Sequence, residues 1–508
     1  MKRFKYILLS ILAVALLSSC DSFLSEKPSK STSLVPTTVD QLDYLFNSYG
    51  NFYKEQCYAE ILSSDSFGLL TSMTKAKTSI PGLTPTQYAC WDIDNLPTTS
   101  DYFFSSEYSK IFMANMVLAN LSKVTGSDEK KAQLEKEAHF IRAYSTWLLA
   151  QTYCLPYTEA NKNEPGLTIK ESTSFEESTK RATLQETYDF IEADLNIALG
   201  ITNDMTIVNN KYTSWRANKA AVNGFAARYW LNRNDYAKAY QYAKTALESH
   251  DVLVNYNTDM HYAATPTYVT VNGEKIQVFY PYTETNQTDL TDMFEWKEFM
   301  YFRMAYYGYW WYIPSEKLLA LYNHDYDLRY KYHIVQHYSY AQSGMTNPAY
   351  DYPGYIFFFK DRIPSGPTTA EMLLIEAECL ARQNKVSEAM TVVNKLRATR
   401  MASDAPDAIK YLSATSKDAA IKLIIEERQR EMPFTERWYD IRRLNNNEDS
   451  NDDVGELTRN YFPYSAASVL TTEEPITYTL SKDSRRYAAP IPEADITASN
   501  GAIEQNEY

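Results

Sequence analysis

Two stretches of the chain carry the same pattern of small and polar residues at an offset of 150 positions. The matching pairs are Ala227 and Ala377, Asn234 and Asn384, Ala239 and Ala389, Ala243 and Val393, and Ala246 and Leu396. In each stretch an apolar segment ends at a polar turn, 232–235 or 382–385, and a second segment then has small or apolar residues at i, i+4 and i+7. Small residues at this spacing let two helices approach closely. The pattern favours two copies of one helical hairpin over two unrelated hairpins, and such hairpins bury their faces only by stacking on others.

Further segments have apolar residues at helical spacing and predict helices. The predicted helices span residues 105–122, 128–153, 183–199, 216–232, 235–249, 368–383, 386–400 and 416–432. Ser127 precedes two acidic residues, which is a favourable helix start, and Thr183 with Glu186 has the spacing of a capping box. We therefore predict an all-α fold built of stacked tetratricopeptide-like hairpins.

The residues between 251 and 366 have a different pattern. Asn272-Gly273 lies between β-type residues within 269–282, which is typical of a tight β-hairpin, and proline and glycine cluster at 348–354 and 364–367. The segment 445–482 is similar. We expect a loop-rich part with short strands at 251–366, between helical parts at 20–250 and 367–508. Because loops carry recognition more often than scaffolds do, we expect this part to face the ligand.

The first twenty residues resemble a secretory leader. A short basic start is followed by an apolar run from Tyr6 to Leu17 that is too brief to span a membrane. Small residues then precede Cys20, as in a bacterial lipobox. We predict a signal peptide at 1–19 and a lipid anchor on Cys20, and a plain signal peptide with an incidental cysteine is the alternative.

Charge and metal-ligand patterns exclude several classes of partner. The net charge is −14, and loss of Lys2, Arg3 and Lys5 with the leader makes it more negative. Phosphates would be repelled, so we predict no nucleic-acid partner. The remaining cysteines do not have the spacing of metal ligands. The sequence does not decide whether Cys57 and Cys90 form a disulfide bridge. His333 and His337 have no third ligand nearby, and the acidic run 448–453 lacks EF-hand spacing, so we expect no metal and no cofactor.

No catalytic motif stands out in the chain. Nucleophile-elbow and P-loop patterns are absent from the sequence. Glu426, Glu427 and Glu431 have the residue type of a glycosidase carboxylate pair, which leaves a secreted glycosidase as an alternative. The neighbouring arginines favour an ion-pair network instead, with Glu426 and Arg430 at i, i+4. We predict a protein that is not an enzyme.

Segments spread over the whole chain resemble a known family. They are Leu42–Asp65, Glu137–Tyr144 (similar to EARFLRAY), Tyr153–Tyr157, Arg216–Lys219, Ile424–Glu431 with Arg437–Arg443 (similar to NERRRE followed by RWFDLRR), and Tyr487–Pro492 with Glu504–Asn506 (similar to PIP followed by QN). From Cys20 to its last residue the chain resembles the SusD/RagB family of outer-membrane nutrient-binding lipoproteins. The segments 251–366 and 445–482 match none of the family's motifs, so the ligand is left open.

The resemblance implies a fold, a place and a partner. It implies one SusD-like domain at 20–508, with tetratricopeptide-like units on one side and an irregular ligand-binding half on the other. It further implies a lipid-anchored protein on the exterior of the outer membrane, which binds an oligosaccharide and passes it to a SusC-like TonB-dependent transporter. A peptide ligand is the alternative, because a β-edge within 269–282 could add a peptide strand.

Aromatic residues are the best ligand-binding candidates. The chain has 43 tyrosines, and aromatic residues make up 14% of it. Flat rings beside amides or carboxylates match the apolar face and the hydroxyl rim of a sugar. The family often places a stacking tryptophan with a polar partner in the region of Trp91, and Asp94 has the spacing of that partner. The other candidates are Trp296, Tyr301, Trp310 and Trp311, for which a small core beneath the loops is the alternative.

Overall fold

Long helices pack side by side along one side of the molecule. The computed structural model describes residues 36–96, 100–174, 176–209 and 211–508, so the predicted signal peptide and Cys20 lie outside the described residues. The long helices are α3 (Val39–Asn47), α7 (Tyr102–Asn120), α8 (Asp128–Tyr153), α9 (Leu184–Ala198), α10 (Lys219–Asn232), α11 (Tyr236–Ser249), α17 (Thr369–Arg382), α18 (Val386–Arg400), α20 (Lys417–Glu431) and α21 (Arg437–Leu444). Each predicted helix is confirmed, with ends that differ by at most three residues.

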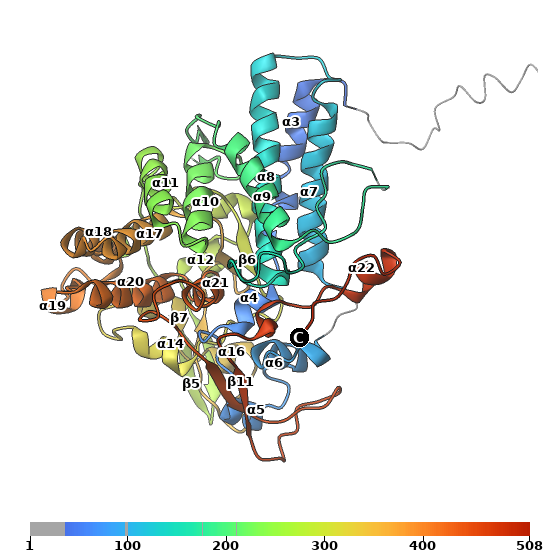
Figure 1. The fold of residues 1–508 in the computed structure, drawn as a ribbon. Helices are drawn as coiled ribbons and strands as arrows, with labels where there is room; N and C mark the ends of the chain where they lie inside the picture. Colours follow the sequence, from blue (N-terminus) through green and yellow to red (C-terminus); the bar gives the residue numbers. More distant parts are fainter. Residues whose placement is uncertain (1–35, 97–99, 175, 210) are drawn as a thin grey trace, which may run out of the picture.

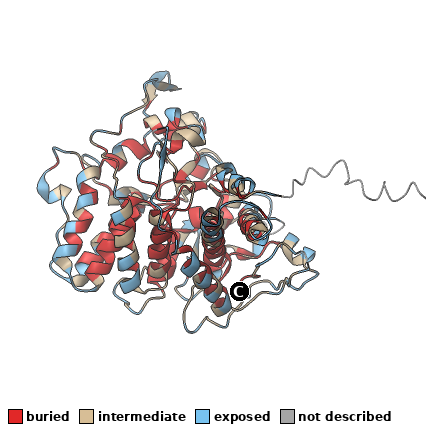
Figure 2. Cartoon of the chain, turned by 90° about the horizontal axis from the view of Figure 1, so that it is seen from above, coloured by how far each residue is buried: buried red, intermediate tan, exposed pale blue. Residues whose placement is uncertain are grey.

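Neighbouring helices in this array form antiparallel hairpins. Helix α7 packs on α8, α10 on α11 and α17 on α18, and α17 also contacts α11 and α20 (Figure 1). Figure 2 shows that the buried faces of these helices turn toward one another. The predicted helical class is therefore confirmed.

The two related hairpins turn in the same way. Asn234 and Asn384 both have left-handed backbones, with φ of 58° and 62°. After α10, the N–H of Asp235 donates to the carbonyl of Trp230, and after α17 the N–H of Lys385 donates to that of Leu380. These are the bonds of a Schellman motif, and asparagine is one of the few residues that tolerate its left-handed position. The offset of 150 positions thus reports a shared turn.

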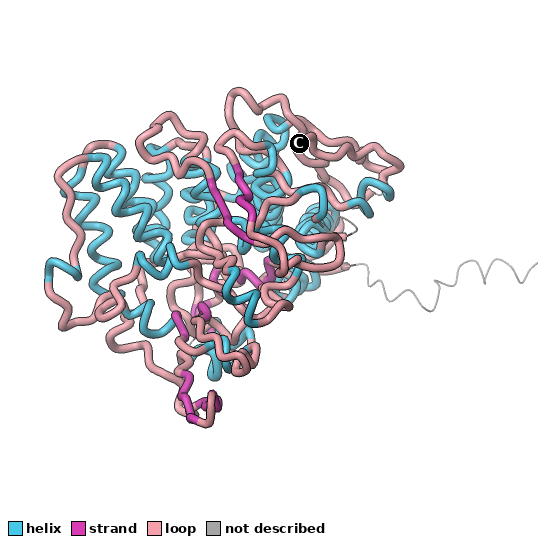
Figure 3. The backbone as a smooth tube through the Cα atoms, turned by 90° about the horizontal axis from the view of Figure 1, so that it is seen from below, coloured by secondary structure: helices cyan, strands magenta, loops and turns pink. Residues whose placement is uncertain are grey.

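The remaining elements are shorter, and many of them lie outside 251–366. The short helices are α4 (Tyr58–Ser63), α5 (Thr71–Ala76), α6 (Leu83–Ala89), α12 (Tyr282–Asn286), α13 (Leu290–Met293), α14 (Glu316–Leu321), α15 (Leu328–His333), α16 (Tyr338–Gln342), α19 (Asp407–Lys410), α22 (Glu493–Ala498), and the 3₁₀ turns η1 (Tyr49–Asn51), η2 (Ile93–Asn95) and η3 (Arg485–Tyr487). Of these, α19 contacts α18. With the loops around them, most of these elements form an irregular part of the molecule. Figure 3 shows short strands among loops beside the helical array.

Most strands form local hairpins. They are β2 (Ile207–Val208) with β3 (Lys211–Tyr212), β4 (Thr267–Val271) with β5 (Glu274–Val278), β7 (Ile334–Val335) with β8 (Gly354–Tyr355), and β10 (Leu457–Tyr461) with β11 (Ile476–Leu480). The turn between β4 and β5 is Asn272-Gly273, with φ of 52° and 85°. Positive φ at both positions is what a type I′ turn needs, so the predicted hairpin is confirmed.

One sheet is not local, and it joins distant parts of the chain. Strand β6 (Met304–Tyr306) lies between β1 (Lys54–Glu55), to which it runs parallel, and β9 (Arg362–Pro364), to which it runs antiparallel. In the register Lys54 is beside Met304, and Tyr306 is opposite Arg362. Side chains on alternate residues share a face, so Lys54, Tyr306 and Arg362 lie on one side of this sheet.

The four described cysteines are free and buried, so no Cys57–Cys90 bridge is present. The Sγ atom of Cys57 lies 3.4 Å from the hydroxyl of Thr152 instead. Among the described residues, no helix combines the length and hydropathy that a membrane span requires.

The left-handed turn residue provides a test of the repeat. In Asn384→Ala, the methyl side chain should lower the free energy of unfolding by about 1 kcal/mol, because alanine is strained in this conformation. Asn384→Gly is the matched control and should be as stable as the original chain. Urea unfolding measures both, and equal stability of the two variants would contradict the role of the turn.

Candidate ligand-binding site

The three-stranded sheet positions a cation between two tyrosine rings. The Nζ atom of Lys54 lies 3.9 Å from the ring centre of Tyr306 and 4.6 Å from that of Tyr102, the first residue of α7. Tyr102 is 52% exposed. The sheet and the start of α7 therefore present two phenol rings and one ammonium group on the same surface.

The chain after β6 forms a tight turn that presents two more rings. The N–H of Trp310 donates to the carbonyl of Tyr307 at 3.0 Å, and Tyr338 donates its hydroxyl to the carbonyl of Trp310 at 2.5 Å. Tyr309 and Trp310 are 48% and 40% exposed, although most large aromatic side chains of the described residues are at least partly buried. The turn thus holds two large rings in solvent.

Trp310 and its neighbour Phe359 share an unfavourable backbone conformation. Their φ values are 62° and 44°, in the left-handed region that bulky residues avoid at a cost of about 1–2 kcal/mol. Phe359 lies in a tight turn in which Phe358 and Arg362 exchange backbone hydrogen bonds, and its ring centre is 6.0 Å from that of Trp310. Strain of this kind is concentrated at functional sites, where the surrounding structure holds it in place.

Tyr58 completes the surface from the N-terminal side. Its ring centre is 5.9 Å from that of Tyr309, and its hydroxyl accepts a hydrogen bond from the amide of Gln56 at 2.9 Å. A Cβ on Gly308 would lie 3.4 Å from the ring of Tyr306 and 3.9 Å from the hydroxyl of Tyr58, so the turn at Gly308 lies next to both side chains. We call Tyr58, Tyr102, Tyr306, Tyr309, Trp310 and Phe359 the aromatic platform.

The aromatic platform has the groups to bind a ligand without catalysing a reaction. Its ring faces offer apolar contact area, and its phenols, the Gln56 amide and the Lys54 ammonium donate hydrogen bonds. Burial raises the pKa of Tyr58, so this phenol stays protonated at neutral pH. These are the groups that a flat ligand with a hydroxyl rim requires.

Of the predicted ring candidates, only Trp310 lies on the platform. Trp91, Trp296, Tyr301 and Trp311 are 2 to 4% exposed and belong to the core, so they are not available for stacking in this structure. The indole N–H groups of Trp91 and Trp311 donate to the carbonyls of Ser63 and Pro353. The Asp94 side chain is exposed and lies 3.8 Å from Arg486, apart from the buried Trp91 ring.

Sequence reasoning missed most of the platform. Tyr306 and Tyr309 lie in the ring-rich stretch that contains Trp310, but Tyr58, Tyr102 and Phe359 were not candidates. They reach the site through the pairing of three strands that are two or three residues long. No periodicity in the sequence signals such pairing; the adjacent rings of 306–312 were the one available sign.

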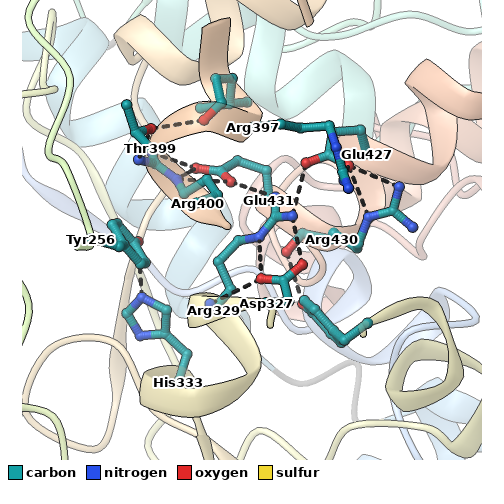
Figure 4. Close-up of polar contacts among 12 residues, drawn as sticks. Tyr256, Asp327, Arg329, His333, Arg397, Thr399, Arg400, Glu427, Arg430 and Glu431 are labelled. Atoms are coloured by element: carbon teal, nitrogen blue, oxygen red, sulfur yellow. Dashed lines mark hydrogen bonds and ion pairs between the residues drawn. The ribbon is translucent and has the colours of Figure 1, made fainter. Parts of the chain in front are cut away.

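The carboxylates of α20 belong to a buried ion network (Figure 4). Glu427 accepts hydrogen bonds from Arg397 at 2.6 Å and Arg430 at 2.9 Å, and it pairs with Arg329 at 2.8 Å. Arg430 thus pairs at i, i+3 with Glu427, rather than with Glu426 as predicted. Because Glu427 is enclosed by three arginines, it has neither the access nor the proton of a glycosidase acid.

A second carboxylate ties the network to the irregular part. Glu431 accepts from Arg400 of α18 at 2.9 Å and from Arg329 of α15 at 2.8 Å. His333, also on α15, lies against the hydroxyl of Tyr256 and the carbonyl of Ile356, and burial lowers its pKa to about 4. His337 contacts Asp351 instead. No group of three or more metal-ligating side chains is found in the described part of the chain.

Comparisons with known proteins match the whole described chain. A family model described as starch-binding and associating with the outer membrane matches residues 22–231, and a model described as the SusD family matches residues 225–508. SusD-like protein P2 of Formosa agariphila is 35% identical over 118 residues, which is 22% of this chain and about a fifth (21%) of that protein.

Solved structures share the fold. A SusD superfamily protein from Bacteroides thetaiotaomicron has a TM-score of 0.61 at 18% identity, with 93% of this chain and 100% of that chain covered. A putative sugar-binding protein from Bacteroides vulgatus has a TM-score of 0.60 at 16% identity, with 92% and 98% covered. A laminarin-binding SusD-like protein has a TM-score of 0.51 at 15% identity, with 92% and 99% covered.

The buried network provides a stability test. Glu427→Gln leaves three arginines short of a charge and should lower the free energy of unfolding by about 3–5 kcal/mol. Glu426→Gln is the matched control, since this neighbouring side chain is half-buried and should change stability by less than about 0.5 kcal/mol. Urea unfolding compares the two, and similar effects would contradict the network.

The network also makes the free energy of unfolding depend on pH. Burial would raise the pKa of Glu427, but Arg329, Arg430 and Arg397 outweigh it and hold the pKa well below its ordinary value. Because the folded-state pKa is depressed, the stabilisation is complete above the unfolded-state pKa of about 4.3 and is lost as pH falls below it. Unfolding between pH 3 and 6 should show a shallower slope for Glu427→Gln than for the original chain. Identical slopes would refute this assignment.

Proposed function

Because the chain belongs to the SusD family, we propose that it binds an oligosaccharide on the aromatic platform and delivers it to a SusC-like TonB-dependent transporter. The observation that carries this proposal is the turn 307–310, which holds the rings of Tyr309 and Trp310 in solvent although the backbone at Trp310 is strained. A ring that is exposed at such a cost is explained by a ligand that covers it.

The chemistry of the aromatic platform supports a sugar ligand. The C–H face of a pyranose is apolar and stacks on a ring, and its hydroxyls accept bonds from Tyr58, Gln56 and Lys54. Several shallow contacts of this type give moderate affinity, which suits a protein that must release its ligand inward. On this proposal the protein performs no chemical step.

The location is also part of the proposal. We expect a single SusD-like domain at 20–508, anchored through a lipid on Cys20 to the exterior of the outer membrane after removal of residues 1–19. The matched family description, which names the outer membrane, supports this placement. A lid over the transporter barrel would open by a hinge motion to admit the ligand.

A peptide ligand is the second candidate. Within the described residues, β4 and β5 pair only with each other, so each strand has an edge to which a peptide could add. Mass spectrometry of ligand that copurifies from the native host separates the two candidates. Peptides in place of sugars would favour this second function.

Loss of one ring tests the site. Trp310→Ala removes roughly 60 Å² of stacking area, which at about 25 cal/mol per Å² costs on the order of 1.5 kcal/mol, or roughly tenfold in affinity. Isothermal titration with laminari-, malto-, xylo-, galacturono- and alginate oligosaccharides measures it. Tyr411→Ala is the control, because Tyr411 is 41% exposed and lies outside the platform. Glycan binding that Trp310→Ala leaves unchanged would reject the site.

A further inference from the structure

Lys54 has no ion-pair partner among the described residues, unlike the buried charged groups near it. Arg303 pairs with Glu55 at 2.6 Å and with Glu107 at 2.7 Å, and Lys110 also pairs with Glu107. Lys54, one residue before Glu55, forms no ion pair among the residues that the structure describes. Its contacts are the faces of Tyr102 and Tyr306.

The tyrosine faces hold the Lys54 ammonium without neutralising it. A ring quadrupole attracts a cation, but it carries no net charge. Burial lowers the pKa of Lys54, Asp361 opposes this effect, and Arg362 adds to it. The half-buried cation therefore has an incomplete set of partners, which an anion would complete.

A second cation lies on the same face of the sheet. Arg362 is opposite Tyr306 in the strand register and packs 5.7 Å from the ring centre of Phe359. It pairs with Asp361 at 3.3 Å, a buried carboxyl whose pKa is raised by burial, and a second carboxyl, Asp289, lies within electrostatic range of it. Lys360, which precedes Asp361 in the chain, is paired with Glu284.

The platform therefore presents two cations, Lys54 and Arg362, in a chain whose net charge is −14. Asp361 pairs with Arg362 and acts on Lys54 only through its charge, without an ion pair, and Asp289 also lies within electrostatic range of Arg362. A chain this acidic repels anions at long range, so an anionic ligand needs a specific cation at close range. A hydroxyl of a neutral sugar can accept a hydrogen bond from this ammonium, but only an anionic group can also balance its charge.

We propose that the aromatic platform takes an acidic oligosaccharide, whose carboxylate or sulfate group pairs with Lys54 while its rings stack on Tyr309 and Trp310. This inference rests on the proposed function and specifies its ligand class. Arg362 supports the same anion from the neighbouring strand. Charge then selects the ligand, and the rings supply most of the contact area.

The test uses matched pairs of probes that differ in charge. Isothermal titration of the full mature chain compares hexagalacturonate with its methyl ester, a hexamannuronate with β-1,4-mannohexaose, and sulfated laminarihexaose with laminarihexaose. We expect at least one acidic probe to bind at least tenfold more tightly than its neutral counterpart. We also expect that affinity to fall as NaCl rises from 50 to 500 mM, since salt screens the pair.

Variants then assign the preference to Lys54. Lys54→Met should weaken the acidic probe at least tenfold and neutral binding clearly less, because a neutral sugar loses only one hydrogen bond, whereas Lys54→Arg should retain the preference. Lys275→Met is the matched control, because Lys275 lies 4.2 Å from the ring centre of Tyr268 on the β4–β5 hairpin, in a similar cation–π contact. It should bind every probe as the original chain does.

The possible failures are distinguishable. If neutral probes bind as tightly as acidic ones and Trp310→Ala abolishes that binding, the acidic-ligand inference is wrong and the proposed function stands. Equal losses of acidic and neutral binding in Lys54→Met would also overturn the inference, because they would indicate a packing role. If no probe in the panel binds, the proposed function itself fails.

Discussion

Buried arginine–carboxylate pairs join the helical array to the irregular part of the molecule, and the arrangement of the aromatic platform depends on them. Arg329 of α15 reaches Glu427 and Glu431 of α20, and Arg303 beside β6 reaches Glu55 and Glu107 of α7. Such pairs are costly to desolvate, so their main effect is to specify one arrangement rather than to add much stability. Each pair joins segments that are far apart in the chain. Because the irregular part has few and short strands, these contacts take over the role that a larger sheet has elsewhere.

The aromatic platform follows from that arrangement. Three strands of two or three residues would not form a stable sheet alone, but the ion pairs of Arg303 with Glu55 and Glu107 join β1, the start of β6 and α7 beneath it. The register then sets Lys54, Tyr306 and Arg362 on one face, and the turns after β6 and before β9 add Trp310 and Phe359. The strained backbone at these two residues persists because the surrounding core over-determines it. A rigid surface of this type binds with little loss of conformational freedom, which favours affinity from a small contact area.

The sequence could predict those parts of the structure that are determined by residues close together in the chain. The helices were predictable because apolar periodicity and capping residues act within a few positions, and the shared turn at Asn234 and Asn384 was visible as a repeat. Four of the rings expected at the ligand lie in the core instead: Trp91, Trp296, Tyr301 and Trp311. The identity of an aromatic residue in a loop does not reveal whether its side chain points to the core or to solvent. Tyr58, Tyr102 and Phe359 could not be found, since their proximity depends on strand pairing between residues 250 positions apart, such as Lys54 and Met304. Glu427 was correctly assigned to an ion network, although the pairing partner of Arg430 was wrong.

The most direct measurement of the central claim is a crystal structure of the protein with an oligosaccharide bound. We expect sugar rings against Tyr309 and Trp310, with an anionic group within hydrogen-bonding distance of Lys54 Nζ. A glycan bound on another surface, with the platform bare or covered by the protein itself, would contradict it.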